Sequence, residues 1–327
     1  MNDPAAKTGN TCRANQALAV LFLAVQLFQL VLLPVWLLPS GPAWGWLLLL
    51  PVLLSNSWWA FIHEAVHGVL FPNKQANRLA GRVNAVLFGA PFDLLRRGHL
   101  LHHAASRTKR ERSEVYVPER DNRLLFATGY YLRLFGGLYC LEVIGGLALL
   151  LPRRALRALV RRAGGEHNVL DDLAKRILEP ATLRAVRIDA TLVLGVYALA
   201  FALYGEHAWM LALAVAGRGL LISLVDNVFH YGTPLDQTRY ARNLALPDWA
   251  SRLILHFNLH GAHHQRPGLA WWQLPDYQRN SGMGFQGKWL PALLAQLKGP
   301  IPEPRLRALS QGPPCLETLG ALENSIL

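Results

Sequence analysis

The chain has 327 residues, of which 52% are hydrophobic and 17% are charged, and its formal net charge is +12. The cations flank apolar stretches and do not alternate with aromatic residues, which argues against nucleic-acid binding. Three scattered cysteines, Cys12, Cys140 and Cys315, form no CxxC pair. This argues against disulfides and against a built-in zinc ribbon, rubredoxin or ferredoxin-type centre.

Four stretches approach or reach the roughly 20 apolar residues that span a bilayer. They are residues 17–38, 43–62, 188–204 and 208–225. The first two contain no charged side chain, the third contains only Asp189, and the fourth contains only Arg218. Because buried helices of soluble proteins rarely run this long without charge, these stretches predict four transmembrane helices in an all-α integral membrane protein.

The positions of Lys and Arg predict the orientation of these helices. The short connections 39–42 and 205–207 contain neither residue, whereas most cations lie at the other helix ends. We therefore expect two hairpins whose bends lie outside, with both termini and a helical cap in the cytoplasm. A bacterial inner membrane is the expected location, and the basic charge suits its anionic inner leaflet.

The segment 123–151 is mostly apolar but contains Arg123, Arg133 and Glu142. A full span there would separate the histidine clusters described below, so we expect a helix lying in the membrane interface. Residues 1–14 are expected to form a disordered tail, residues 15–298 one membrane domain, and residues 299–327 a weakly ordered tail.

Eight of the twelve histidines form three clusters with metal-ligand spacing. They read HEAVH at 63–67, HLLHH at 99–103 and HGAHH at 260–264. Residues three and four apart share one face of a helix, so each cluster directs two or three imidazoles toward one point. Neutral imidazole suits iron, zinc, copper and nickel. The sequence therefore predicts a polynuclear metal site.

Two other functions use some of these residues. The first cluster matches the HExxH pattern of zinc metalloproteases, in which the glutamate is the general base. A zinc protease needs only one further protein ligand, so that interpretation leaves five of the six histidines in the other two clusters unexplained. A membrane metal sensor or transporter is the third possibility, but a transporter would place its ligands within the spans.

The three clusters together resemble the integral-membrane fatty acid desaturase family and its hydroxylase relatives, over residues from about 15 to 290. The matching segments are HEAVHG at 63–68, GHLLHHAASR at 98–107, DNVFHYGT at 226–233 and NLHGAHHQRPGLAWWQLP at 258–275. The resemblance implies a non-haem centre of two iron ions. Its implied ligands are His63, His67, His99, His102, His103, His230, His260, His263 and His264.

Further residues are candidates for supporting roles. Several family members have asparagine where this chain has Asp226, so Asp226 is either an outer ligand or an orienting partner of His230. The other residues expected near the ligands are Asn227, Glu64, His256 and Asn258. Candidates for the wall of a substrate tunnel are Trp271, Trp272 and Arg218. Arg218 could instead pair with Asp189. Trp58 and Trp59 are also candidates for the tunnel wall, although they better suit an interfacial belt. His167 and His207 suit the surface.

The resemblance implies an oxygen-dependent oxidoreductase that acts on a fatty acyl chain, either free or linked to CoA, a carrier protein or a lipid. The HxxHH spacing of the second cluster favours desaturation; a hydroxylase or a terminal-alkene-forming decarboxylase is the alternative. The electrons must come from a separate reductase and a ferredoxin, rubredoxin or cytochrome-type carrier. Basic residues at 107–112 or 153–162 would attract an acidic carrier.

Overall fold

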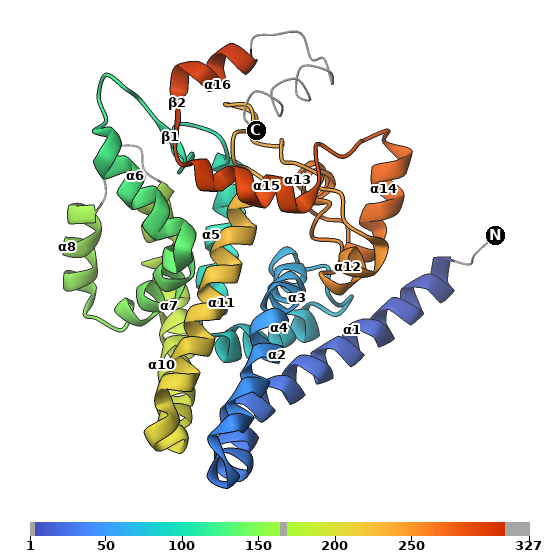
Figure 1. Ribbon diagram of the computed structural model, residues 1–327, viewed down its shortest axis with the longest axis vertical. Coiled ribbons are helices and arrows are strands. Elements are labelled where there is room, and N and C mark those ends of the chain that lie inside the picture. The colour runs from blue at the N-terminus through green and yellow to red at the C-terminus, as the bar shows by residue number, and fades with distance from the viewer. Residues whose placement is uncertain (1–3, 164–168, 311–327) are drawn as a thin grey trace.

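The computed structural model describes residues 4–163 and 169–310, and these are mostly helical. Two long hairpins extend toward the same end of the molecule, and short helices and loops gather at the opposite end (Figure 1). His167 and the last 17 residues of the expected C-terminal tail lie outside the described residues.

The first hairpin begins with α1 (Pro4–Leu27), so residues 4–14, expected to be a disordered tail, are its first turns. The helix continues as the π-helical η1 (Phe28–Leu37), where Pro34 lacks the N–H that a regular α-helix needs. The other elements of this hairpin are η2 (Leu38–Ser40), η3 (Pro42–Leu48), α2 (Leu49–Leu53) and α3 (Ser55–His67).

In the described residues between the hairpins lie six α-helices and a strand: α4 (Lys74–Phe88), α5 (Phe92–Ala105), β1 (Val115–Tyr116), α6 (Arg123–Leu132), α7 (Leu138–Ala148), α8 (Arg153–Ala163) and α9 (Val169–Ile177). The side chain of Asn73 caps α4 by accepting from the N–H groups of Gln75 and Ala76. Between α6 and α7 lies η4 (Arg133–Gly137), where Phe135 and Gly136 leave the helical conformation.

The second hairpin consists of α10 (Pro180–Tyr204), η5 (Gly205–His207) and α11 (Ala208–Val228). Gly205 takes a positive φ of 52°, which ends α10, and α11 then packs back against it. The remaining elements are α12 (Asp248–Leu253), α13 (His260–Gln265), η6 (Trp271–Gln273), α14 (Leu274–Asn280), α15 (Trp289–Ala295), η7 (Gln296–Lys298), β2 (Ile301–Pro302) and α16 (Glu303–Ser310).

Strands β1 and β2 pair in parallel, with Val115 opposite Ile301 and Tyr116 opposite Pro302. This pairing, and the buried Leu306 of α16, order residues 301–310 within the segment that was expected to be a weakly ordered tail. Strand β1 was not expected, because two residues that pair with a segment far along the chain carry no periodic signal.

Three described helical stretches are long and apolar enough to cross a membrane: Thr11–Ser40, Arg123–Ala148 and Pro180–Val228. A fourth is present if Pro42–Leu53 and Ser55–His67, which are bent by 40°, count as one span. Pro180–Val228 is the second hairpin and contains two of the expected spans. Arg123–Ala148, which was expected to lie in the membrane interface, is also long and apolar enough to cross a membrane, although its helix is broken at Phe135 and Gly136.

The largest buried cluster lies beneath the histidine-bearing segments and packs α1, α3, α4 and α11 together. Its aromatic members include Trp58, Trp59, Phe88 and Phe229. Trp58 and Trp59 are 1% and 5% exposed, so neither belongs to an interfacial belt. This buried cluster supports the end of α3 from which the first two histidines project.

Arg218 is buried beside this cluster. It does not pair with Asp189, which binds Arg82 instead. Its guanidinium donates to the carbonyl of Phe88 at 3.0 Å, the hydroxyl of Tyr197 at 2.9 Å and the side chain of Gln29 at 3.1 Å. It also lies 5.2 Å from the ring centres of Trp58 and Phe88. Aromatic faces and neutral oxygens thus stabilise this buried cation.

Candidate metal centre

Four segments bring the nine histidines together. His63 and His67 lie one turn apart at the end of α3, which stops at Gly68 in a left-handed conformation (φ 76°). The last turns of α5 carry the second cluster, α13 carries the third, and His230 lies two residues beyond the end of α11.

The side-chain nitrogens form two groups, within each of which all candidate donor atoms lie within 4.8 Å of one another. The first group, the five-histidine group, contains His63, His67, His99, His103 and His263. The second, the four-histidine group, contains His102, His230, His260 and His264. Neighbouring histidines of the second cluster therefore serve different groups: His99 and His103, one turn apart, face one, and His102 faces the other.

Within the five-histidine group the Nε2 atoms face one another closely. The distance from His99 Nε2 is 2.9 Å to His63 Nε2 and 3.0 Å to His103 Nε2. His263 Nε2 lies 3.0 Å from His103 Nε2. In the four-histidine group, His102 Nε2 lies 3.1 Å from His230 Nε2.

These short contacts are better explained by imidazole nitrogens arranged to coordinate a metal ion than by hydrogen bonds between the rings. A neutral imidazole has one N–H, so a series of facing Nε2 atoms would leave lone pairs opposed. Imidazole nitrogens about 2.1 Å from one ion, at right angles, lie about 3 Å apart. In the described part of the chain, Nε2 of His67 and Nε2 of His264 are also buried without a hydrogen-bond partner. The donor set therefore suits two metal ions.

Burial sets the protonation state of these side chains. It lowers the pKa of His99, His103, His230, His260, His263 and His264, and the neighbouring imidazoles lower it further. The residues are therefore neutral near pH 7, which is the form that binds a metal. His102 differs: burial lowers its pKa, but the charge and hydrogen bond of Glu111 outweigh burial and raise it.

Glu111 is a functional candidate that the sequence did not reveal. Its carboxylate accepts a hydrogen bond from His102 Nδ1 at 2.7 Å. This bond fixes the proton on Nδ1 and leaves Nε2 free to face His230, an arrangement typical of metal-binding histidines. Glu111 lies nine residues beyond His102 in an irregular segment, so no helical spacing links the two residues.

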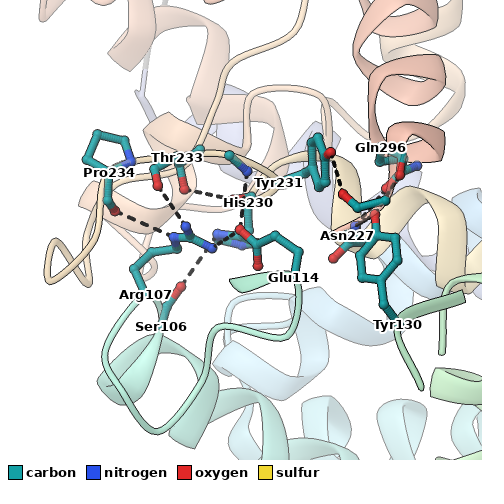
Figure 2. Close-up of polar contacts among 12 residues, drawn as sticks. Ser106, Arg107, Glu114, Tyr130, Asn227, His230, Tyr231, Thr233, Pro234 and Gln296 are labelled. Carbon is teal, nitrogen blue, oxygen red and sulfur yellow. Dashed lines mark hydrogen bonds and ion pairs between the residues drawn. The ribbon is translucent and has the colours of Figure 1, made fainter. Parts of the chain in front are cut away.

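A buried ion pair holds the segment that carries His230 (Figure 2). Arg107, with a positive φ of 65°, donates to Glu114 and to the carbonyls of Thr233 at 2.7 Å and Pro234 at 3.5 Å. Glu114 also accepts from the backbone N–H of Gly232 at 3.2 Å. The pair thus fixes the turn after His230 from both sides.

Of the residues expected to support the ligands, Asn227, Asp226 and Glu64 each have a different environment. Asn227 points away from the imidazoles and donates to Gln296 at 2.8 Å, so it is not a partner of the metal site (Figure 2). Asp226 lies close enough to affect the charge of His102, but in the described residues it neither joins the four-histidine group nor bonds to His230. Glu64 accepts from the backbone N–H of Trp271 at 2.9 Å and so links α3 to the segment after α13.

His256 and Asn258 meet at Ser251 and not at the imidazoles. Ser251 Oγ donates to Asn258 at 2.6 Å, so His256 Nδ1 donates to Ser251 Oγ at 2.8 Å. His256 also stacks on Trp271. Asn258 donates to the carbonyl of Leu244 at 2.9 Å. Both residues therefore shape the loop that leads into α13.

The aromatic candidates for a substrate tunnel have separate roles. Trp59 is the tryptophan nearest the ligands, with its ring centre 6.4 Å from that of His63 and 6.5 Å from that of His99. Trp271 is partly buried and donates from its indole to Asn15 at 3.0 Å. Trp272 is partly exposed in η6. Arg218 is buried among the contacts described above, and within the described residues its Nε has no hydrogen-bond partner.

The basic stretch 107–112 is not a free cationic surface. Arg107 is buried, Arg110 pairs with Asp172 at 2.6 Å, and Arg112 pairs with Glu303 at 2.9 Å. These three arginines are thus engaged within the chain, and the attraction of an acidic carrier by this stretch stays a prediction. Charge runs in a sequence do not reveal their tertiary partners.

A cavity of about 510 Å³ opens beside both histidine groups. His103 of one group and His264 of the other line it, together with Arg239, Arg266 and residues 265–269. It connects the imidazoles with the surface that α13 and its following loop form. His207 lies apart from the site, in the bend between α10 and α11.

Comparison with known proteins was consistent with this geometry. A family model described as fatty acid desaturase matches residues 41–285, three quarters of the chain, and this range includes all nine histidines. Neither a curated protein nor a solved structure matches the chain. The family match covers well over half of the sequence, and the chain belongs to the fatty acid desaturase family.

Proposed function

We propose that this protein is an oxygen-dependent diiron oxidoreductase that desaturates a fatty acyl chain. The observation that carries the proposal is the separation of nine imidazoles into groups of five and four, close to one another and largely buried. Each group has enough donors to hold one iron and leave room for another ligand. The five-histidine group would hold one ion and the four-histidine group the second.

Two iron ions held by these groups would supply chemistry that protein side chains lack, the use of dioxygen to remove hydrogen from an unactivated methylene. The overall reaction consumes an acyl CH2–CH2 unit, one O2, two electrons and two protons and yields an alkene and two waters. The side chains around the groups hold the donors. Glu111 keeps the proton of His102 on Nδ1, and Arg107 and Glu114 fix the turn after His230.

Hydroxylation and terminal decarboxylation would use the same donor set and differ in how the substrate is held. The HxxHH spacing of His99, His102 and His103 supports desaturation. A zinc protease is disfavoured because the carboxylate of Glu64, its required general base, already binds the backbone of Trp271. Five histidines around the first site also exceed what such an enzyme needs.

The proposed topology places the histidine groups on the cytoplasmic side and the two hairpin bends outside. The arrangement in Figure 1, with both bends at one end and α13 and α15 at the other, supports it. A reduced carrier of the ferredoxin, rubredoxin or cytochrome type would approach from the cytoplasm. The acyl chain, free or carrier-linked, would approach from the membrane.

Expression in a bacterial host of defined lipid composition tests the reaction. Lipids and headspace volatiles are profiled together, because internal alkenes, hydroxy acids and volatile 1-alkenes identify the three product classes. We expect new internal alkenes with the wild-type chain and none with His102→Ala. Hydroxy acids or 1-alkenes alone would refute desaturation, and product from the His102→Ala variant would refute the diiron assignment.

A further inference from the structure

A second site of interest lies away from the histidines, where α8 meets the start of α10. A groove of about 570 Å³ is present there. Figure 1 shows α8 at the edge of the molecule, with α10 running from this level toward the hairpin bend. The groove is lined by Arg153, Pro180, Leu183, Arg184, Arg187, Ile188, Thr191 and Leu192.

Three arginines and no acidic residue line the groove. Arg187 donates to the carbonyls of Leu149 at 3.0 Å and Leu151 at 2.6 Å, so it caps the end of α7. Arg153 donates to the carbonyl of Leu178. Arg184 is exposed and has no ion pair or hydrogen bond within the described ranges. All three charges therefore lack a carboxylate partner among the described residues.

The wall below the arginines is apolar. Ile188 and Leu192 follow Arg184 at intervals of four residues, so all three side chains share one face of α10. Ile188 and Leu192 are 49% and 51% exposed. With a rise of about 1.5 Å per residue, the face extends about 12 Å from Arg184 to Leu192. A cationic end thus continues into a lipid-facing apolar surface along a span.

Helix α8 reinforces this pattern. Leu156 is buried against Ile177 and Leu183, which anchors the helix beside α10. Arg154, Arg157, Arg161 and Arg162 remain exposed around it. A basic helix at the end of a membrane span lies at the level of lipid headgroups, where each arginine gains about 1 kcal/mol from an anionic surface.

We propose that this groove binds one anionic phospholipid, with its phosphate at Arg153 and Arg184 and an acyl chain along Ile188 and Leu192. The positive charge of the arginines complements the phosphate, and the exposed apolar side chains of Ile188 and Leu192 suit contact with the acyl chain. The ligand is a membrane lipid and is distinct from the substrate of the metal centre. The inference does not depend on the function proposed above.

Native mass spectrometry of the full chain in a neutral detergent measures the binding directly. The probes are dioleoyl phosphatidylglycerol, dioleoyl phosphatidylcholine and inorganic phosphate. The test variants are Arg184→Gln and the double variant Arg153→Gln/Arg184→Gln. The matched control is Arg154→Gln/Arg161→Gln, which removes the same charge from exposed positions outside the groove. Circular dichroism of each variant checks the fold.

The wild-type chain should retain phosphatidylglycerol in preference to phosphatidylcholine. Arg184→Gln should weaken that binding about fivefold and the double variant about 25-fold, from about 1 kcal/mol for each charge, and the control should keep most of it. Equal binding by wild type and double variant would overturn the proposal. So would displacement of the lipid by millimolar inorganic phosphate, because the apolar wall would then contribute nothing. Loss of turnover with an acidic redox carrier, without loss of lipid binding, would assign these arginines to the carrier instead.

Discussion

Replacing Glu111 by glutamine should weaken one metal site and leave the other intact. Glu111 accepts from His102 Nδ1 at 2.7 Å, and the two side chains are 19% and 18% exposed. Glutamine keeps the size and one oxygen but removes the charge that favours the Nδ1–H form. Alanine removes the acceptor altogether.

Loss of a carboxylate that orients a metal-bound histidine costs roughly 10- to 100-fold in metal affinity. The bond is short and mostly shielded from water, so we expect about tenfold weaker binding for Glu111→Gln and about 100-fold for Glu111→Ala. These factors correspond to about 1.4 and 2.8 kcal/mol. The weakening should be confined to the four-histidine group, because Glu111 contacts only His102 among the nine histidines.

The assay is metal content after timed dialysis against a chelator, measured by inductively coupled plasma mass spectrometry. At a chelator concentration that leaves the wild type loaded, both variants should retain one ion per chain. The control is Glu119→Gln, since Glu119 is exposed and has no hydrogen bond or ion pair to a histidine within the described residues. Unchanged content in Glu111→Ala, or loss of both ions together, would refute this account of Glu111.

Three further predictions concern the structure around the donors. Arg107→Ala leaves the buried Glu114 without its ion-pair partner, so the free energy of unfolding should fall by about 3–5 kcal/mol. Thermal unfolding in detergent measures this change. A melting temperature lowered no more than by Arg305→Ala would contradict the stabilising role of the ion pair. Gly261→Ala places a Cβ 2.5 Å from the carbonyl oxygen of Ala241 and should displace α13 and lower metal content, whereas Gly268→Ala, with nothing within 4 Å, should not. The metal-free chain should lose stability as pH falls below about 6.5, because histidines of the unfolded chain then bind protons whereas the folded imidazoles, whose pKa values are lowered, do not. Each such histidine lowers the free energy of unfolding by about 1.4 kcal/mol per pH unit. A melting temperature that stays constant from pH 7.5 to 5.5 would contradict the assigned burial.

The sequence predicted the parts of this protein that local spacing governs. His99 and His103 lie four residues apart and share a helical face, so their convergence follows from α-helical geometry alone. The hairpin around Gly205 follows from apolar length and the absence of nearby Lys and Arg. Both features appear in the structure where the sequence placed them.

Tertiary partners could not be predicted in the same way. Asp189 binds Arg82 and not Arg218, because the rotation of α10 about its axis decides which neighbour it faces. Asn227 faces Gln296 for the same reason at the end of α11. Glu111 reaches His102 through an irregular loop, whose conformation has no periodic signature.

Iron content is the most direct test of the central claim. The purified protein, loaded anaerobically with ferrous iron and freed of excess, should hold two irons per chain. His230→Ala should lower this to one iron, because the five-histidine group remains complete. A wild-type content of one ion per chain, or a preference for a single zinc, would contradict a diiron centre divided between these two groups.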